Sequence, residues 1–259
     1  MNSKIQLAEN HCHISSEYFD DPMNEINDLE KSSGLKYIIS MGVEYGNDKE
    51  LIELKKKYKS EFFKIGIGLH PEEVIKLGKL ASHEVERIKL LARDYSNFID
   101  YIGEIGIDFT YPGSKELRHE QIETFREMCK LAVKLGKPVS IHARDSFDEI
   151  IQVIEEVYLE NSRFNGYLHC FTGNFEQGMF FIERGFKLGL GGIITYKKSD
   201  ELRKTVRDLI EFYSDKDFDD IFGLETDSPY LSPEPIRSER NSPRNIKIIA
   251  EYIEKNIIL

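Results

Sequence analysis

The chain has 259 residues, of which 40% are hydrophobic and 31% charged, and its formal net charge at pH 7 is −11. This composition is typical of a soluble globular protein and excludes a disordered chain. The length suits one large barrel or two smaller domains. The acidity argues against a protein that coats DNA irrespective of sequence, because such proteins are usually basic, but it does not exclude a nuclease.

Two further features set the expected location. No apolar run approaches the ~18 residues that a membrane span requires, so we expect no membrane association. The three cysteines, Cys12, Cys129 and Cys170, are an odd number without paired spacing, which argues against a disulfide framework. We therefore expect a cytoplasmic protein, and the sequence indicates no obligate protein partner.

Eight short apolar runs along the chain read as β-strands. They cover residues 4–8, 37–41, 63–69, 99–103, 139–142, 166–169, 186–190 and 221–224. Most are separated by stretches with apolar residues at helical spacings of three and four. The clearest predicted helices cover residues 48–58, 119–135, 146–159 and 201–212, and Gly136 is placed to end the second of them.

Strand and helix thus alternate about eight times over ~250 residues, which predicts an α/β fold consisting of a single (β/α)8 TIM barrel. No linker divides the chain, so we expect one domain over residues 1–259. The competing fold is a doubly wound open sheet, which would need a glycine-rich turn after the first strand. Residues 8–15 contain no glycine.

Side chains that commonly bind metals recur where the predicted strands end. In a parallel barrel these ends share one mouth, where active sites are built. Imidazole nitrogens and carboxylate oxygens suit borderline or hard divalent cations. The ligand-type residues after strands one, four, five, six and eight are His11, His13, Glu104, His142, His169 and Asp227. His70 follows strand three.

Each of these residues also has a purely structural interpretation. A histidine at a strand end is often only hydrogen-bonded, Glu104 could cap a helix, and Asp227 could fix the turn before Pro229. Unrelated structural roles would not place ligand types after five strands of one chain. The combination therefore predicts a metal centre.

The motifs around these residues resemble those of the TatD family of metal-dependent deoxyribonucleases, within the amidohydrolase-like metal-dependent hydrolases. The resemblance runs from His11 to Pro243. It rests on His11-Cys12-His13, Gly68-Leu69-His70-Pro71, Gly103-Glu104-Ile105-Gly106-Ile107-Asp108, Pro138 to Arg144, His169-Cys170-Phe171-Thr172-Gly173, Glu225-Thr226-Asp227-Ser228-Pro229-Tyr230-Leu231 and Asn241-Ser242-Pro243.

The resemblance implies two divalent metal ions, with Mg²⁺ expected and Zn²⁺ or Mn²⁺ as alternatives. It implies that His11, His13, Glu104 and Asp227 bind one ion, that Glu104 bridges to the second, and that His142 and His169 complete the second site. The implied activity is hydrolysis of phosphodiester bonds in DNA, often exonucleolytic, on single strands or ends. The chain departs from the family in having Glu9 where an aspartate is usual.

The expected mechanism is attack by a metal-activated water, with Asp227 orienting the water and accepting its proton and Glu104 spacing the metals. We assign Arg144 and His70 to substrate binding. Tyr111, Phe171 and Tyr230 could stack on bases or pack loops. Two alternatives stay open: hydrolysis of another ester or amide on the same barrel, and a catalytically inactive scaffold.

Overall fold

The computed structural model describes residues 5–258, and its Cα positions group into two compact units. Of the described residues, unit 1 contains 5–39, 60–63 and 169–258, and unit 2 contains 40–59 and 64–168. Residues 1–4 and 259 lie outside the described part, and so does Lys4 of the predicted first strand. The expectation of a single domain over residues 1–259 stays a prediction.

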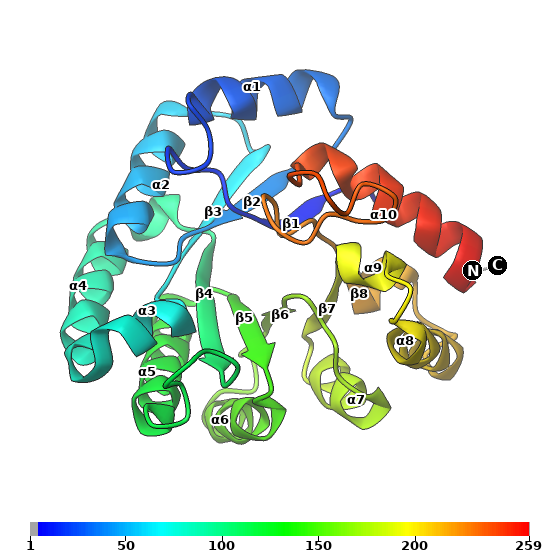
Figure 1. Cartoon of the computed structure of the whole chain (residues 1–259). Coiled ribbons are helices and arrows are strands. Elements are labelled where there is room, and N and C mark those ends of the chain that lie inside the picture. The colour runs from blue at the N-terminus through cyan, green and yellow to red at the C-terminus, as the bar shows by residue number, and fades with distance from the viewer. Residues whose placement is uncertain (1–4, 259) are drawn as a thin grey trace. The chain divides into compact units, whose positions relative to one another are not determined.

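Unit 1 carries the first strand and the last two strands. Its elements are β1 (Glu9–Cys12), α1 (Pro22–Ser32), the start of β2 (Ile38–Met41), α7 (Phe175–Glu183), β7 (Lys187–Leu190), α8 (Asp200–Phe212), α9 (Phe218–Ile221), β8 (Phe222–Leu224) and α10 (Ile246–Ile253). The red α10 packs against β8, and Arg244 just before it forms ion pairs with Glu25 and Asp28 of α1 (Figure 1). Strands β7 and β8 pair in parallel.

Unit 2 carries the strands and helices of the middle of the chain. Its elements are α2 (Tyr45–Lys57), most of β3 (Phe63–Ile67), α3 (Pro71–Leu77), α4 (Ala81–Asp94), β4 (Tyr101–Asp108), α5 (Arg118–Leu135), β5 (Val139–Arg144), α6 (Phe147–Glu160) and β6 (Gly166–Leu168). The pairs β3–β4, β4–β5 and β5–β6 are parallel. The long helix α5 packs against β4, between α4 and α6 (Figure 1).

The predicted fold class, a (β/α)8 TIM barrel, is confirmed. The eight strands form one sheet whose order follows the chain from β1 to β8. Within unit 1, backbone hydrogen bonds join β1 and the residue after it to the segment after β8. Asp227 N–H donates to His11 O at 2.9 Å, and His13 N–H donates to Ser228 O at 2.8 Å. Gly136 ends α5 in the left-handed conformation, with φ of 64°, as the sequence predicted.

Two strand predictions need correction. The first strand covers Glu9–Cys12 instead of residues 4–8, and the fourth extends to Asp108, beyond its predicted end at Gly103. In both places the strand continues through buried polar residues, among them Glu9, His11 and Glu104. An apolar pattern cannot reveal such residues, because their burial depends on hydrogen-bond partners that come from elsewhere in the chain.

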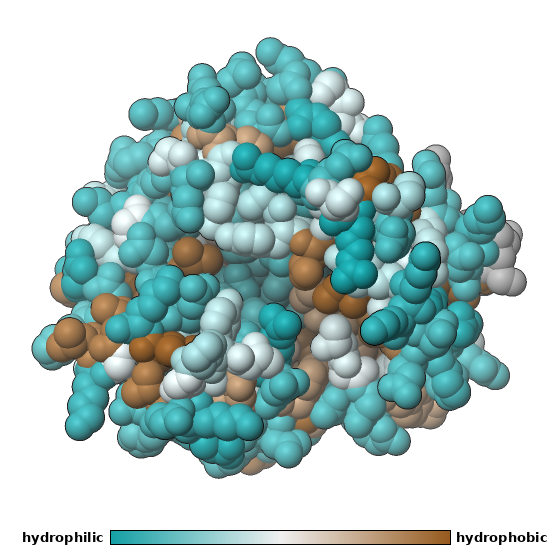
Figure 2. Space-filling view, in the orientation of Figure 1, coloured by the Kyte–Doolittle hydropathy of each residue, from teal (hydrophilic) through white to brown (hydrophobic). Residues whose placement is uncertain are grey.

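One face of the molecule is largely polar. Figure 2 shows a face on which hydrophilic side chains predominate, with smaller hydrophobic groups between them. The large hydrophobic side chains that are exposed within residues 5–258 are Leu80, Leu90, Leu159, Phe212 and Tyr230. No helix of the described chain has the length and apolar character needed to cross a membrane.

Candidate functional site

A first cluster of metal-type side chains lies in unit 1, and we call it the His11 cluster. It consists of His11, His13, His169, Glu225 and Asp227. His11 lies within β1 and His13 one residue beyond it, so strand alternation places both side chains on the same face. The other three residues follow β6 and β8. All five are at least nine-tenths buried.

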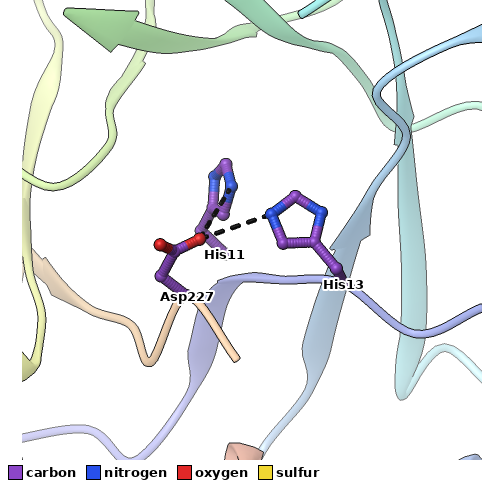
Figure 3. Close-up of side chains that lie close together, drawn as sticks. All are labelled: His11, His13 and Asp227. Carbon is purple, nitrogen blue, oxygen red and sulfur yellow. Dashed lines mark ion pairs between the residues drawn. The ribbon is translucent and has the colours of Figure 1, made fainter. Parts of the chain in front are cut away.

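Three imidazoles of the His11 cluster converge on one carboxylate oxygen. The distances to Oδ1 of Asp227 are 3.3 Å from Nε2 of His13, 3.9 Å from Nε2 of His11 and 4.0 Å from Nε2 of His169. Figure 3 shows this carboxylate facing the rings of His11 and His13. The rings of His11 and His169 are stacked, with their centroids 3.7 Å apart.

These distances fit a bound divalent ion. Ligand atoms about 2.1 Å from a tetrahedral ion lie about 3.4 Å from one another. The observed nitrogen-to-oxygen distances of 3.3–4.0 Å are close to this value. A mixed set of imidazoles and one carboxylate suits Zn²⁺, Mn²⁺ and similar ions. The His11 cluster can therefore hold a metal with little rearrangement.

Two buried carboxylates, Glu225 within the His11 cluster and Glu9 outside it, hold neighbouring parts of the chain in place. Oε1 of Glu225 lies 3.2 Å from Nδ1 of His169 and accepts a hydrogen bond from the Cys170 N–H. A proton on Nδ1 of His169 would face this carboxylate and would leave Nε2 with a lone pair for a metal. Glu9 accepts hydrogen bonds from the backbone N–H groups of His11 and Thr226 and from the Thr226 hydroxyl. The longer side chain of Glu9 thus fixes the backbone of β1 and of the segment after β8.

Asp227 is charged at neutral pH. Burial by itself would raise the pKa of its carboxyl group, but His169, His13 and His11 outweigh burial, and the net shift is downward. Its φ of 54° is unusual for a residue other than glycine. Such strain of about 1 kcal/mol or more persists only where surrounding contacts enforce it, and it is common at functional sites.

A second cluster lies in unit 2, and we call it the Glu104 cluster. It consists of His70, Glu104, Asp108 and His142. Glu104 and Asp108 lie four residues apart on β4, so they share one face of the strand. His142 of β5 lies beside both, with Nδ1 3.0 Å from Oε1 of Glu104 and Nε2 3.0 Å from Oδ2 of Asp108.

The contacts of His142 leave a place for a cation. Burial would raise the pKa of Asp108, but hydrogen bonds from His142 and Thr110 lower it to about 2. The ionised Asp108 requires a proton from Nε2 of His142. In the neutral ring, Nδ1 then presents a lone pair 3.0 Å from a Glu104 oxygen, which is also an acceptor. A second proton or a metal ion is needed between them.

His70 has the opposite arrangement of donor and acceptor. It is the N-cap residue of α3, and its Nδ1 accepts a hydrogen bond from the Glu72 N–H at 3.1 Å. A neutral His70 must therefore carry its proton on Nε2, which lies 3.5 Å from Oε1 of Glu104 and 3.4 Å from Nδ1 of His142. Although His70 lies within reach of a shared ion, this tautomer suits a hydrogen-bond donor rather than a metal ligand.

The predicted site residues thus fall into two groups. Unit 1 brings together His11, His13, His169 and Asp227, and unit 2 brings together His70, Glu104 and His142. Arg144 lies two residues beyond His142 at the exposed end of β5, and within residues 5–258 its guanidinium makes no ion pair. The assignment of His142 and His169 to one ion, and the bridging role of Glu104, stay predictions.

Sequence reasoning missed two functional contacts. The link between Asp108 and His142 was not foreseen, although the spacing of Glu104, Gly106 and Asp108 places all three on one strand face. The contact between Glu225 and His169 joins residues 56 positions apart. No short motif could have revealed it.

Comparison with known proteins gives several relatives over nearly the whole chain. An uncharacterised metal-dependent hydrolase of Buchnera aphidicola, BU355, is 32% identical over 252 residues, which cover 95% of this chain and 90% of that protein. A mouse protein named "Putative deoxyribonuclease TATDN3" is 27% identical, with coverage of 96% and 81%. The crystal structure of YJJV, a TatD homologue from Escherichia coli K12, superposes with a TM-score of 0.77 at 22% identity and covers 95% of this chain and 89% of that one.

The family model described as TatD-related DNase matches residues 8–257. This range contains every residue of the His11 and Glu104 clusters. The chain therefore belongs to the TatD-related DNase family of metal-dependent hydrolases.

Proposed function

We propose that this protein hydrolyses phosphodiester bonds in DNA, working from single-stranded ends, with two divalent metal ions as cofactors and Mg²⁺ as the expected ion. The observation that carries the proposal is the convergence of three imidazole nitrogens on one oxygen of Asp227. The name of the mouse relative, which refers to a deoxyribonuclease, supports DNA as the substrate.

The two ions would be held by six residues of the two clusters: His11, His13, Glu104, His142, His169 and Asp227. Bound ions would act as Lewis acids towards a phosphate oxygen and lower the pKa of a coordinated water towards neutrality. Each bound ion would also add two positive charges to the acidic chain, and these charges would attract a phosphate.

Asp227 is the proposed general base. Its charged carboxylate has one oxygen near the imidazoles, and the second remains able to accept a proton from water. The left-handed backbone of Asp227 and its N–H bond to His11 O keep this carboxylate in one place. General-base assistance of this kind contributes ~10²–10⁴-fold to a rate.

Arg144 and His70 are the proposed substrate-binding residues. The guanidinium of Arg144 is exposed and can bind two phosphate oxygens at once. Nε2–H of His70 can donate one further hydrogen bond to a phosphate oxygen. Neither residue needs a metal to be oriented, because the β5 backbone and the α3 N-cap position them.

Single-stranded oligonucleotides labelled at the 5′ or the 3′ end test this proposal. Each should be incubated with the protein and with Mg²⁺, Mn²⁺ or Zn²⁺ in turn, beside a small carboxylic ester and a lactone. We expect stepwise shortening of the DNA from one end and no comparable turnover of the esters. If the protein turns over the ester or the lactone but cleaves DNA with none of the three ions, its substrates belong to the alternative class of esters and amides.

A further inference from the structure

Tyr230 is an exposed aromatic side chain beside the His11 cluster. Its side chain is 48% exposed, and its ring meets that of His13 edge to face, with the centroids 6.0 Å apart. A tyrosine ring that is exposed to water does not contribute the favourable free energy that burial of its apolar surface would give. Tyr230 therefore offers a binding surface next to the position proposed for the scissile phosphate.

A second tyrosine holds Tyr230 in place. The hydroxyl oxygens of Tyr18 and Tyr230 lie 2.7 Å apart, and their rings are T-shaped with centroids 5.9 Å apart. Burial, followed by this hydrogen bond, raises the pKa of Tyr18, so its hydroxyl stays protonated at neutral pH. The negative charge of Glu17 also raises this pKa.

The backbone around Tyr230 is fixed as well. Its N–H donates to Asp227 O at 2.9 Å, and its own carbonyl accepts a hydrogen bond from the buried Asn241 amide at 2.6 Å. Leu231, the next residue, has a φ of 52°, which is unusual for a side chain of this kind. A ring held in this way loses little conformational entropy when a ligand binds to it.

A positive charge contacts the backbone of Tyr18. The guanidinium of Arg240 donates to the Tyr18 carbonyl and lies 5.3 Å from the centre of the Phe19 ring. Arg240 is exposed. An aromatic surface beside a cation is the combination that single-stranded nucleic acids require, since bases stack on the ring while the backbone phosphates approach the charge.

From these contacts we propose that Tyr230, supported by Tyr18, is a stacking subsite for the unpaired base of the nucleotide next to the scissile phosphate. This inference rests on the proposed function. One sugar separates a base from its phosphate, so a phosphate at the His11 cluster brings a base within reach of a ring 6.0 Å from His13. A base inside a duplex is already stacked on its neighbours, so the subsite selects single strands and frayed ends.

The other aromatic residues considered from sequence do not offer the same surface. Phe171 is 2% exposed and belongs to the core. Tyr111 is half-buried, and its hydroxyl donates to Glu72 in unit 2 at 3.3 Å. Of these three, Tyr230 alone combines exposure with a ring contact to a histidine of the His11 cluster.

A fluorescent base tests the stacking directly. A single-stranded oligonucleotide with terminal 2-aminopurine and phosphorothioate linkages, which resist hydrolysis, is titrated with protein in the presence of Mg²⁺. Stacking on a tyrosine ring quenches 2-aminopurine. Three variants are compared with the wild type: Tyr230→Leu removes the ring, Tyr230→Phe keeps the ring without its hydroxyl, and Phe212→Leu removes another exposed aromatic ring, from α8. KM and kcat for the normal oligonucleotide are measured in parallel.

We expect quenching by the wild type, Tyr230→Phe and Phe212→Leu, and its loss in Tyr230→Leu. KM should rise about tenfold in Tyr230→Leu, with little change in kcat. If Tyr230→Leu cleaves normally and shows the same quenching and the same KM as the wild type, the subsite is overturned, but the proposed function is not. A wild-type protein that neither binds nor cleaves the oligonucleotide would overturn the proposed function together with the subsite.

Discussion

Nε2 of His13 lies 3.3 Å from Oδ1 of Asp227, although the two residues come from opposite ends of the chain. Backbone hydrogen bonds between β1 with its following residue and the segment after β8 bring them together: one joins His13 to Ser228 and one joins Asp227 to His11. The His11 cluster thus depends on the last strand reaching the first. The cluster can therefore form only when the two ends of unit 1 have folded against each other.

Asp227→Asn should separate catalysis from metal binding. The variant keeps the size of the side chain and one coordinating oxygen, but it loses the negative charge and the proton acceptor. Turnover of a DNA oligonucleotide should fall by ~10²–10⁴-fold, while the affinity for DNA changes little. The control is Asp215→Asn, on the exposed surface of unit 1. Near-normal turnover by Asp227→Asn with its metal bound would show that the base lies elsewhere.

Asp108→Asn should weaken metal binding at the Glu104 cluster. The carboxylate accepts the Nε2 proton of His142 at 3.0 Å and so raises the basicity of Nδ1. Loss of such an outer contact typically costs ~10–100-fold in metal affinity. Calorimetric titration with the divalent ion measures this cost directly. Asp94→Asn, an exposed position on α4, serves as the control, and equal affinities in the two variants would contradict the orienting role of Asp108.

Ionisation of Asp48, in unit 2, should make the free energy of unfolding depend on pH. Burial raises the pKa of its carboxyl group well above 3.8, and its Oδ1 accepts a hydrogen bond from the Gly68 N–H. Ionisation is therefore costlier in the folded state, so the contribution of Asp48 to stability is fully present below pH 3.8 and is lost as pH rises through the folded pKa. Asp48→Asn cannot ionise, and denaturant unfolding should show a flatter profile that exceeds the wild type at neutral pH. A parallel profile for the two proteins would contradict this account.

Gly106→Ala should disturb the Glu104 cluster through the backbone. A Cβ at this position would lie 1.9 Å from the carbonyl oxygen of His142, so β4 and β5 would have to separate. Overpacking of this kind costs ~1–3 kcal/mol of the free energy of unfolding, and metal affinity should fall with it. At Gly191 the nearest atom to a Cβ would be 3.4 Å away, so Gly191→Ala should unfold like the wild type. Equal stability of the two variants would refute the packing argument.

The fold was predictable because the helices and most strands follow the apolar pattern. The errors at β1 and β4 share one cause, since both strands continue into polar residues that are buried among hydrogen-bond partners. The approximate positions of His11, Glu104 and Asp227 could be inferred because each falls at or near the end of an apolar run.

The roles of individual ring nitrogens could not be predicted. Nε2 of His142 is bound to Asp108 and Nδ1 of His70 accepts from Glu72, so one ring presents a lone pair where the other presents a proton. Residue identity is the same in both cases. Only the tertiary partners distinguish a metal ligand from a hydrogen-bond donor.

Reversible removal of the metal tests the central claim most directly. The same protein sample is assayed on single-stranded DNA before chelation, after exhaustive chelation and after the divalent ion is restored, with the metal content measured each time. We expect two ions per chain before chelation. Chelation should remove both the ions and the DNA cleavage activity, and restoring the divalent ion should restore both. Full cleavage activity in the metal-free protein would contradict the account and would direct attention to the thiol of Cys170, beside His169.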